Sequence, residues 1–278
     1  MAHLTLGYLT IDAPPAETVT AAAAAGFKSV GIRITGRRLA DPYTQVLDNP
    51  AAVREIKRRV DDSGIRMSNL SGYHVWPDVT LDHQRRIMDV AAELRPDIIV
   101  CNSYQPDEGK FVDLLARTAE MAAPLNIKIA VEFMRYCSVP TLADAIRVTR
   151  ATGMANAGVL LDPLHLDRSG GTPADIAAMD PKDIVFVQLC DAMLLSGPAE
   201  IAQLRTEART GRLYPGDGQL PLYDYLDALP DDIEIECEVP RPDQANLSLE
   251  ERCRICSDRF RSYLDTYVRE RKRQTNWS

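Results

Sequence analysis

The chain has 278 residues, of which 45% are hydrophobic and 26% charged, and its formal net charge is −8. These values are typical of a globular protein with a large core, and the acidic balance argues against a nucleic-acid-binding surface. Because the N-terminus lacks a signal-peptide pattern and no apolar run is long enough to cross a membrane, we expect a cytoplasmic protein.

Apolar runs bounded by turn residues predict eight strands, at residues 4–9, 29–34, 65–70, 97–102, 128–134, 157–162, 184–191 and 233–239. Helical periodicity predicts helices at residues 14–25, 49–63, 81–94, 108–123, 141–151, 172–178, 220–228 and 247–271, and a short helix near 200–208. This alternation is the pattern of a single (β/α)8 TIM barrel with parallel strands, spanning residues 1–278. A doubly wound open sheet is the alternative, but TIDAPP stands where its phosphate-binding glycine loop would follow the first strand.

Four predicted strands end in side chains that can bind a metal. The strand-like runs at residues 129–131, 159–161, 185–187 and 235–237 lead into Glu132, Asp162, Gln188 and Glu238. A parallel barrel brings the carboxyl ends of its strands to one mouth, so these side chains should converge there. Three carboxylates and an amide oxygen suit Mn²⁺ or Mg²⁺, with Co²⁺ as a further candidate. We therefore predict a divalent metal site; the alternative is four unrelated polar strand ends.

Strand eight carries three glutamates of one parity, Glu234, Glu236 and Glu238. Alternation along a strand points all three to the same side. Glu238 lies nearest the mouth and is therefore the predicted ligand. Glu236 lies deeper, where an unpaired carboxylate is costly, and its role stays open at this point.

Five further stretches stand out between residues 131 and 240, namely VEFM, LLDPLHLDRSGG, VQLCD, EARTGRLYPGDGQLPL and ECEVP. They resemble the sugar phosphate isomerase/epimerase family of the xylose isomerase-like TIM barrels. The resemblance implies that Glu132 and Glu238 bind the metal and also act as the acid/base pair that flanks the substrate. It further implies that Asp162 is a third ligand and that His165 lies beside the substrate.

Gln188 departs from the histidine that many epimerases of this family carry in strand seven, and glutamine there is familiar from the 3-dehydroshikimate dehydratase branch. The resemblance therefore leaves two outcomes open. In both, a glutamate removes an α-proton from a metal-bound keto substrate. Return of a proton on the other face gives an isomerase or epimerase, which is the leading hypothesis. Departure of a hydroxyl gives a dehydratase, acting for example on 3-dehydroshikimate or a keto-inositol.

Loops near the predicted mouth supply the candidate substrate-binding residues, His74, His165, Glu207, Arg209 and Arg212. His165 is suited to hydrogen-bond a substrate hydroxyl or to move a proton. The two arginines are suited to clamp a phosphate or carboxylate. We expect a small sugar-like or polyhydroxy keto substrate. We also expect a homo-oligomer, because related barrels often form one.

Overall fold

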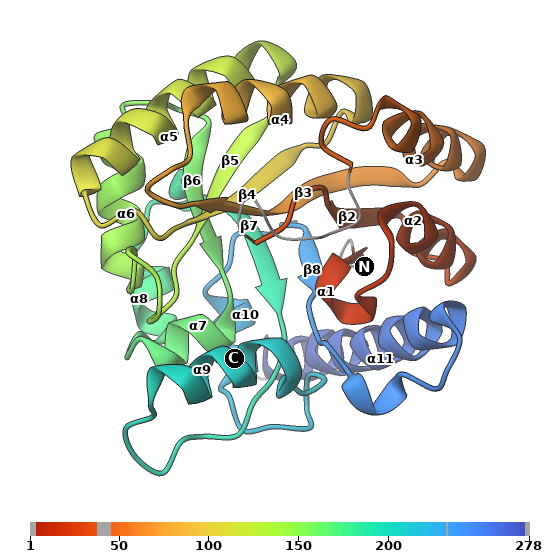
Figure 1. Ribbon diagram of the computed structural model, residues 1–278. Coiled ribbons are helices and arrows are strands. Elements are labelled where there is room, and N and C mark those ends of the chain that lie inside the picture. Colours follow the sequence, from red (N-terminus) through yellow and green to blue (C-terminus); the bar gives the residue numbers. More distant parts are fainter. Residues whose placement is uncertain (1–3, 38–45, 232, 276–278) are drawn as a thin grey trace.

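The computed structural model describes residues 4–37, 46–231 and 233–275. Its strands form one closed parallel barrel in the order of the sequence, and Figure 1 shows the helices as an outer ring around it. The strands are β1 Leu4–Leu6, β2 Ser29–Arg33, β3 Arg66–Val75, β4 Ile98–Ser103, β5 Lys128–Glu132, β6 Ala157–Leu161, β7 Ile184–Leu189 and β8 Ile235–Cys237. The predicted (β/α)8 barrel is therefore confirmed.

The main outer helices are α2 Pro15–Ala24, α3 Pro50–Ser63, α4 Leu81–Leu94, α5 Glu108–Ala122, α6 Leu142–Ala151, α10 Leu222–Asp227 and α11 Leu249–Thr275. Four other helices among the described residues follow strand ends or lie in loops: α1 Tyr8–Ile11, α7 Pro163–Arg168, α8 Pro173–Ala177 and α9 Ile201–Thr210. Single 3₁₀ turns occur at η1 Ala123–Leu125, η2 Pro181–Asp183 and η3 Pro242–Gln244. Among the helices described, even the long α11 has no apolar stretch able to cross a bilayer.

The barrel interior is apolar on one side and polar on the other. Strands β4 to β7 contribute a small hydrophobic cluster of Ile98, Val100, Ala130, Leu160, Val185 and Phe186. Opposite them, Glu236 on β8 is fully buried and accepts hydrogen bonds from Asn69 Nδ2 at 2.5 Å and Gln188 Nε2 at 2.9 Å. Gly31 makes room for this cluster, because a Cβ there would lie 2.6 Å from Glu236 Oε2. The larger hydrophobic core lies between the sheet and the helices.

Most predicted strand boundaries lie within two residues of the observed ones, but the ends of the first and third strands are wrong by more, and both differences shape the mouth. The first strand ends at Leu6 rather than at residue 9, because Gly7 turns against β8 and the chain enters α1. The third strand continues to Val75, through a segment predicted as a loop. Its register against β4 shifts between Leu70 and Tyr73, so three residues of β3 stand opposite two of β4. This bulge lets Ser71 and His74 line the same pocket although they differ in parity.

Candidate active site

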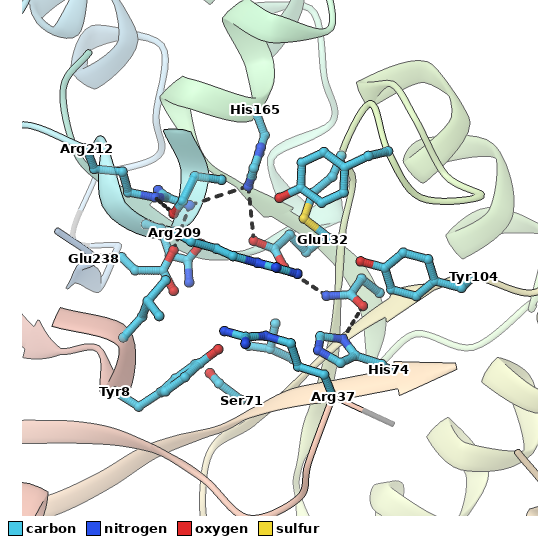
Figure 2. Close-up of a pocket in the computed structure, with 17 residues that line it drawn as sticks. Tyr8, Arg37, Ser71, His74, Tyr104, Glu132, His165, Arg209, Arg212 and Glu238 are labelled. Carbon is cyan, nitrogen blue, oxygen red and sulfur yellow. Dashed lines mark hydrogen bonds and ion pairs between the residues drawn. The ribbon is translucent and has the colours of Figure 1, made fainter. Parts of the chain in front are cut away.

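A pocket opens where the carboxyl ends of the strands meet (Figure 2). Most of the residues predicted as site residues line it, namely His74, Glu132, His165, Gln188, Arg209, Arg212 and Glu238. Asp162 lies behind this lining, completely buried, and reaches the pocket through its contacts with Arg212 and His165. The structure therefore brings the four predicted metal ligands to one place.

The ligand atoms of Glu132, Asp162 and His165 all lie within 4.8 Å of one another, an arrangement that could hold a metal ion. Glu238 joins this group through Arg212, whose buried guanidinium contacts Asp162 with Nη1 and Glu238 Oε2 with Nη2, the latter at 2.9 Å. His165 would therefore be within reach of such an ion, a role that the sequence analysis did not assign to it.

Gln188 completes the oxygen-rich set from β7. Its Nε2 donates to Glu236 Oε1, and its buried Oε1 has no hydrogen-bond partner within the part of the chain that the structure describes. A buried oxygen without a donor is costly unless a ligand contacts it. When Glu132, Asp162 and Glu238 are ionised they carry three negative charges against the single positive charge of Arg212, so a divalent cation would balance the group. The residues present therefore fit a divalent metal.

Asp162 also fixes the start of the helix that follows β6. Its Oδ1 accepts hydrogen bonds from the backbone N–H groups of Leu164 at 2.8 Å and His165 at 3.3 Å, which makes it the N-cap of α7. Pro163 occupies the first turn, where its missing N–H is tolerated. The same carboxylate thus begins the helix that carries His165 and presents that imidazole to the pocket.

The carboxyl groups at the mouth differ in acidity. Burial raises the pKa of Glu132, and the nearby charges of Glu238 and Asp162 add to this rise. Burial and the charge of Asp162 likewise raise the pKa of Glu238, against the opposing effect of Arg212. For Asp162, burial favours a higher pKa, but Arg212 and His165 outweigh it and lower the pKa. Asp162 is therefore the ionised anchor, while the two glutamates retain protons more readily.

His165 is held as a neutral imidazole. Its Nε2 lies 3.6 Å from Glu132 Oε1 and 3.4 Å from Arg212 Nη2. Burial, together with the charges of Arg212 and Arg168, lowers its pKa to about 4 although Asp162 acts in the opposite direction. A neutral histidine can accept a hydrogen bond from a substrate hydroxyl or bind a metal.

Glu207 does not line the pocket, although the sequence suggested it as a substrate-binding residue. Its carboxylate accepts from Arg168 Nε at 2.8 Å and Arg168 Nη2 at 2.6 Å. Arg168 also donates to the backbone oxygen of Met193 at 2.7 Å. This ion pair joins α9 to the end of α7 and to the loop after β7.

Sequence reasoning missed several pocket residues, chiefly Tyr8, Arg37, Ser71, Asn102, Tyr104 and Tyr136. Asn102 Nδ2 donates to Glu132 Oε2 at 3.1 Å, and its Oδ1 contacts His74 Nδ1, so it links β3, β4 and β5. Its position at the end of a predicted strand was a usable signal, since Glu132 was found in the same way. Arg37 lies just after β2, a strand to which no candidate site residue was assigned.

The chain matches the xylose isomerase-like TIM barrel family over residues 19–258 and belongs to that family. It is 29% identical over 153 residues to an inosose isomerase from Bacillus licheniformis, covering 53% of this chain and 52% of the relative. It is 27% identical over 223 residues to a 3-dehydroshikimate dehydratase from Pseudomonas aeruginosa, covering 76% of this chain and 33% of the relative. The chain thus spans about half of one curated relative and a third of the other.

A crystal structure described as the IolI protein with a bound zinc atom superposes on this chain with a TM-score of 0.78 at 18% identity. The match covers 96% of this chain and 99% of that structure. This likeness supports the assignment of the fold.

Proposed function

We propose that this protein is a divalent-metal-dependent isomerase or epimerase that removes an α-proton from a sugar-like keto substrate. The observation that carries this proposal is the convergence of Glu132, Asp162, Gln188 and Glu238 at one pocket, with Gln188 Oε1 left without a hydrogen-bond partner among the described residues. The matches to an inosose isomerase and a dehydratase support an enzyme of this general chemistry.

The four oxygen donors would hold Mn²⁺ or Mg²⁺, and the zinc atom named for the related structure makes Zn²⁺ a necessary comparison. When bound, such an ion polarises the substrate carbonyl and stabilises the negative charge that develops as the α-proton leaves. Arg212, held between Asp162 and Glu238, keeps both carboxylates in fixed positions.

Glu132 and Glu238 come from β5 and β8, which are not neighbours in the barrel, and Figure 2 shows them on separate walls of the pocket. One glutamate removes the α-proton from one face of the substrate, and the other returns a proton to the opposite face. Asn102 fixes the carboxylate of Glu132 by donating to its Oε2. His165, being neutral, accepts a hydrogen bond from a substrate hydroxyl.

A dehydratase is the second candidate, and a specific observation favours it. Glutamine stands at the strand-seven position, and the 3-dehydroshikimate dehydratase aligns with 76% of this chain against 53% for the inosose isomerase. The first step is the same abstraction of an α-proton. The outcome differs because a β-hydroxyl then departs instead of a proton being returned.

Proton NMR in D₂O on Mg²⁺-loaded protein tests both candidates. Inosose, 3-dehydroshikimate, a ketose and a ketose phosphate would be compared, with Glu132→Gln as the inactive variant and Glu207→Gln as the matched control outside the pocket. Deuterium at the α-carbon with a new isomer supports the isomerase, and a new vinylic signal supports the dehydratase. Turnover that persists in Glu132→Gln contradicts both.

A further inference from the structure

We propose that the pocket recognises an anionic group of its substrate, a carboxylate or a phosphate, through Arg37 and Arg209. This inference rests on the proposed function and specifies the substrate class of the same site. It excludes a neutral sugar as the preferred substrate.

Arg37 and Arg209 reach the pocket from different parts of the chain. Arg37 follows β2, and Arg209 lies on α9, yet both line the same pocket. Figure 2 shows both side chains extending into it. Within the ranges that the structure describes, neither guanidinium has a hydrogen bond or an ion pair with a protein group.

Arg37 and Arg209 differ from the neighbouring arginines, which form ion pairs with carboxylates. Arg212, the other arginine that the sequence suggested as an anion clamp, is occupied by Asp162 and Glu238. Arg168 is occupied by Asp167 and Glu207. Glu207, two residues before Arg209 in the sequence, is therefore not available to neutralise it.

The guanidinium groups of Arg37 and Arg209 both lie near His74. Both lie close enough to His74 to lower its pKa, together with burial as the largest cause and with Arg33. Two guanidinium groups that lie near each other without a carboxylate partner among the described residues repel each other. A bound anion removes that repulsion while accepting charge-assisted hydrogen bonds. The hydroxyl groups of Tyr8, Ser71 and Tyr104 line the same pocket and can donate to an anion as well.

Two groups of charged side chains therefore meet at the pocket. Asp162 and Glu238 contact Arg212, and Glu132 lies close to both carboxylates, whereas Arg37 and Arg209 lie near His74 and have no charged partner among the described residues. A substrate that carries both a keto group and an anionic group complements the two groups of side chains. An acidic keto compound or a sugar phosphate has this form, whereas a neutral ketose leaves the two arginines unsatisfied.

Calorimetric titration with a matched set of small ligands tests the inference. Dihydroxyacetone, dihydroxyacetone phosphate and hydroxypyruvate share one hydroxymethyl ketone and differ only in a neutral, a phosphate or a carboxylate group. Each is titrated into Mg²⁺-loaded wild type, Arg37→Gln and Arg209→Gln. Arg117→Gln is the control, because Arg117 lies on the outer helix α5 and pairs with Asp113 at 3.2 Å.

We expect at least one anionic ligand to bind about ten-fold or more tightly than the neutral one, since hydrogen bonds to charged groups are the stronger kind. Each pocket variant should lose this preference while Arg117→Gln keeps it, and the tighter anion identifies phosphate or carboxylate. Equal binding of all three ligands, no binding of either anion, or a preference that survives both variants overturns the inference. Retention of Mg²⁺ by these arginine variants reports on the proposed function separately.

Discussion

Glu236 holds the amide of Gln188 in one of its two orientations. Its Oε1 accepts from Gln188 Nε2 at 2.9 Å, so the amide nitrogen faces inward and Oε1 is left free of protein donors among the described residues. Asn69 holds the other oxygen of the same carboxylate at 2.5 Å. A buried glutamate of unassigned role thus becomes a positioning residue for a proposed metal ligand.

Glu236→Gln should weaken Mn²⁺ binding by about ten- to hundred-fold, the usual effect of losing a group that orients a metal ligand. The new amide can donate to Gln188 and so favours the reversed orientation, which removes Oε1 from the pocket. Calorimetric titration with Mn²⁺ measures the change. Glu234→Gln serves as the control, because Glu234 pairs with Arg66 at 2.6 Å, away from the pocket lining. Equal Mn²⁺ affinity in wild type and Glu236→Gln would contradict this role.

Arg212 is the buried cation that pairs with two of the carboxylates at the mouth, Asp162 and Glu238. Replacing it by glutamine leaves Asp162 and Glu238 buried without their partner, which should lower the free energy of unfolding by about 3 to 5 kcal/mol. A bound divalent ion should offset part of this loss. Urea unfolding in EDTA and in Mg²⁺ measures both effects. A variant as stable as wild type in EDTA would show that the ion pairs contribute nothing.

At the scale of elements, the helix predicted over residues 141–151 is α6, and Thr141 is its N-cap. Thr141 Oγ1 accepts from the backbone N–H of Asp144 at 3.2 Å and contacts its carboxylate at 2.6 Å. Thr141→Ala should therefore lower the free energy of unfolding by about 1 kcal/mol without altering Mn²⁺ affinity. Denaturant unfolding and calorimetry check the two halves of this prediction. A loss of metal affinity in this variant would mean that α6 positions the site.

The sequence located all eight strands because each is an apolar run bounded by turn residues, and strand ends then identified Glu132, Asp162, Gln188 and Glu238. It did not reveal α7, because a six-residue helix is too short to show periodicity, and its cap is a residue already assigned to the metal. The bulge in β3 was also hidden, since it depends on pairing with β4. The place of Arg37 in the pocket and the ion pairs of Arg212 and Glu207 arise from tertiary contacts, which the spacing of residues along the chain does not reveal.

At the scale of the whole molecule, stability of the metal-free protein should fall as pH rises. Burial raises the pKa values of Glu132, Glu236 and Glu238, so the folded state binds these protons more tightly than the unfolded state. Such a contribution is present at low pH and is lost as pH rises through the raised pKa values. His74 and His165, whose pKa values are lowered, act in the opposite sense only at more acidic pH.

We therefore expect the melting temperature in EDTA to decrease between about pH 6.5 and about pH 9. The difference in melting temperature between Mg²⁺ and EDTA samples should widen over the same range, because carboxylates bind a metal when they are deprotonated. Thermal unfolding across this range measures both trends. A melting temperature in EDTA that rises over the same interval would show that the buried glutamates are not protonated in the folded protein.

We propose above all that the mouth of this barrel binds a divalent cation through the four strand-end residues. Calorimetric titration of Mn²⁺ into metal-stripped wild type, Glu132→Gln and Glu207→Gln tests it most directly. We predict a single Mn²⁺ ion per chain in wild type and in Glu207→Gln, and severe loss of binding in Glu132→Gln. No Mn²⁺ binding in wild type, or equal binding in Glu132→Gln, would contradict the claim.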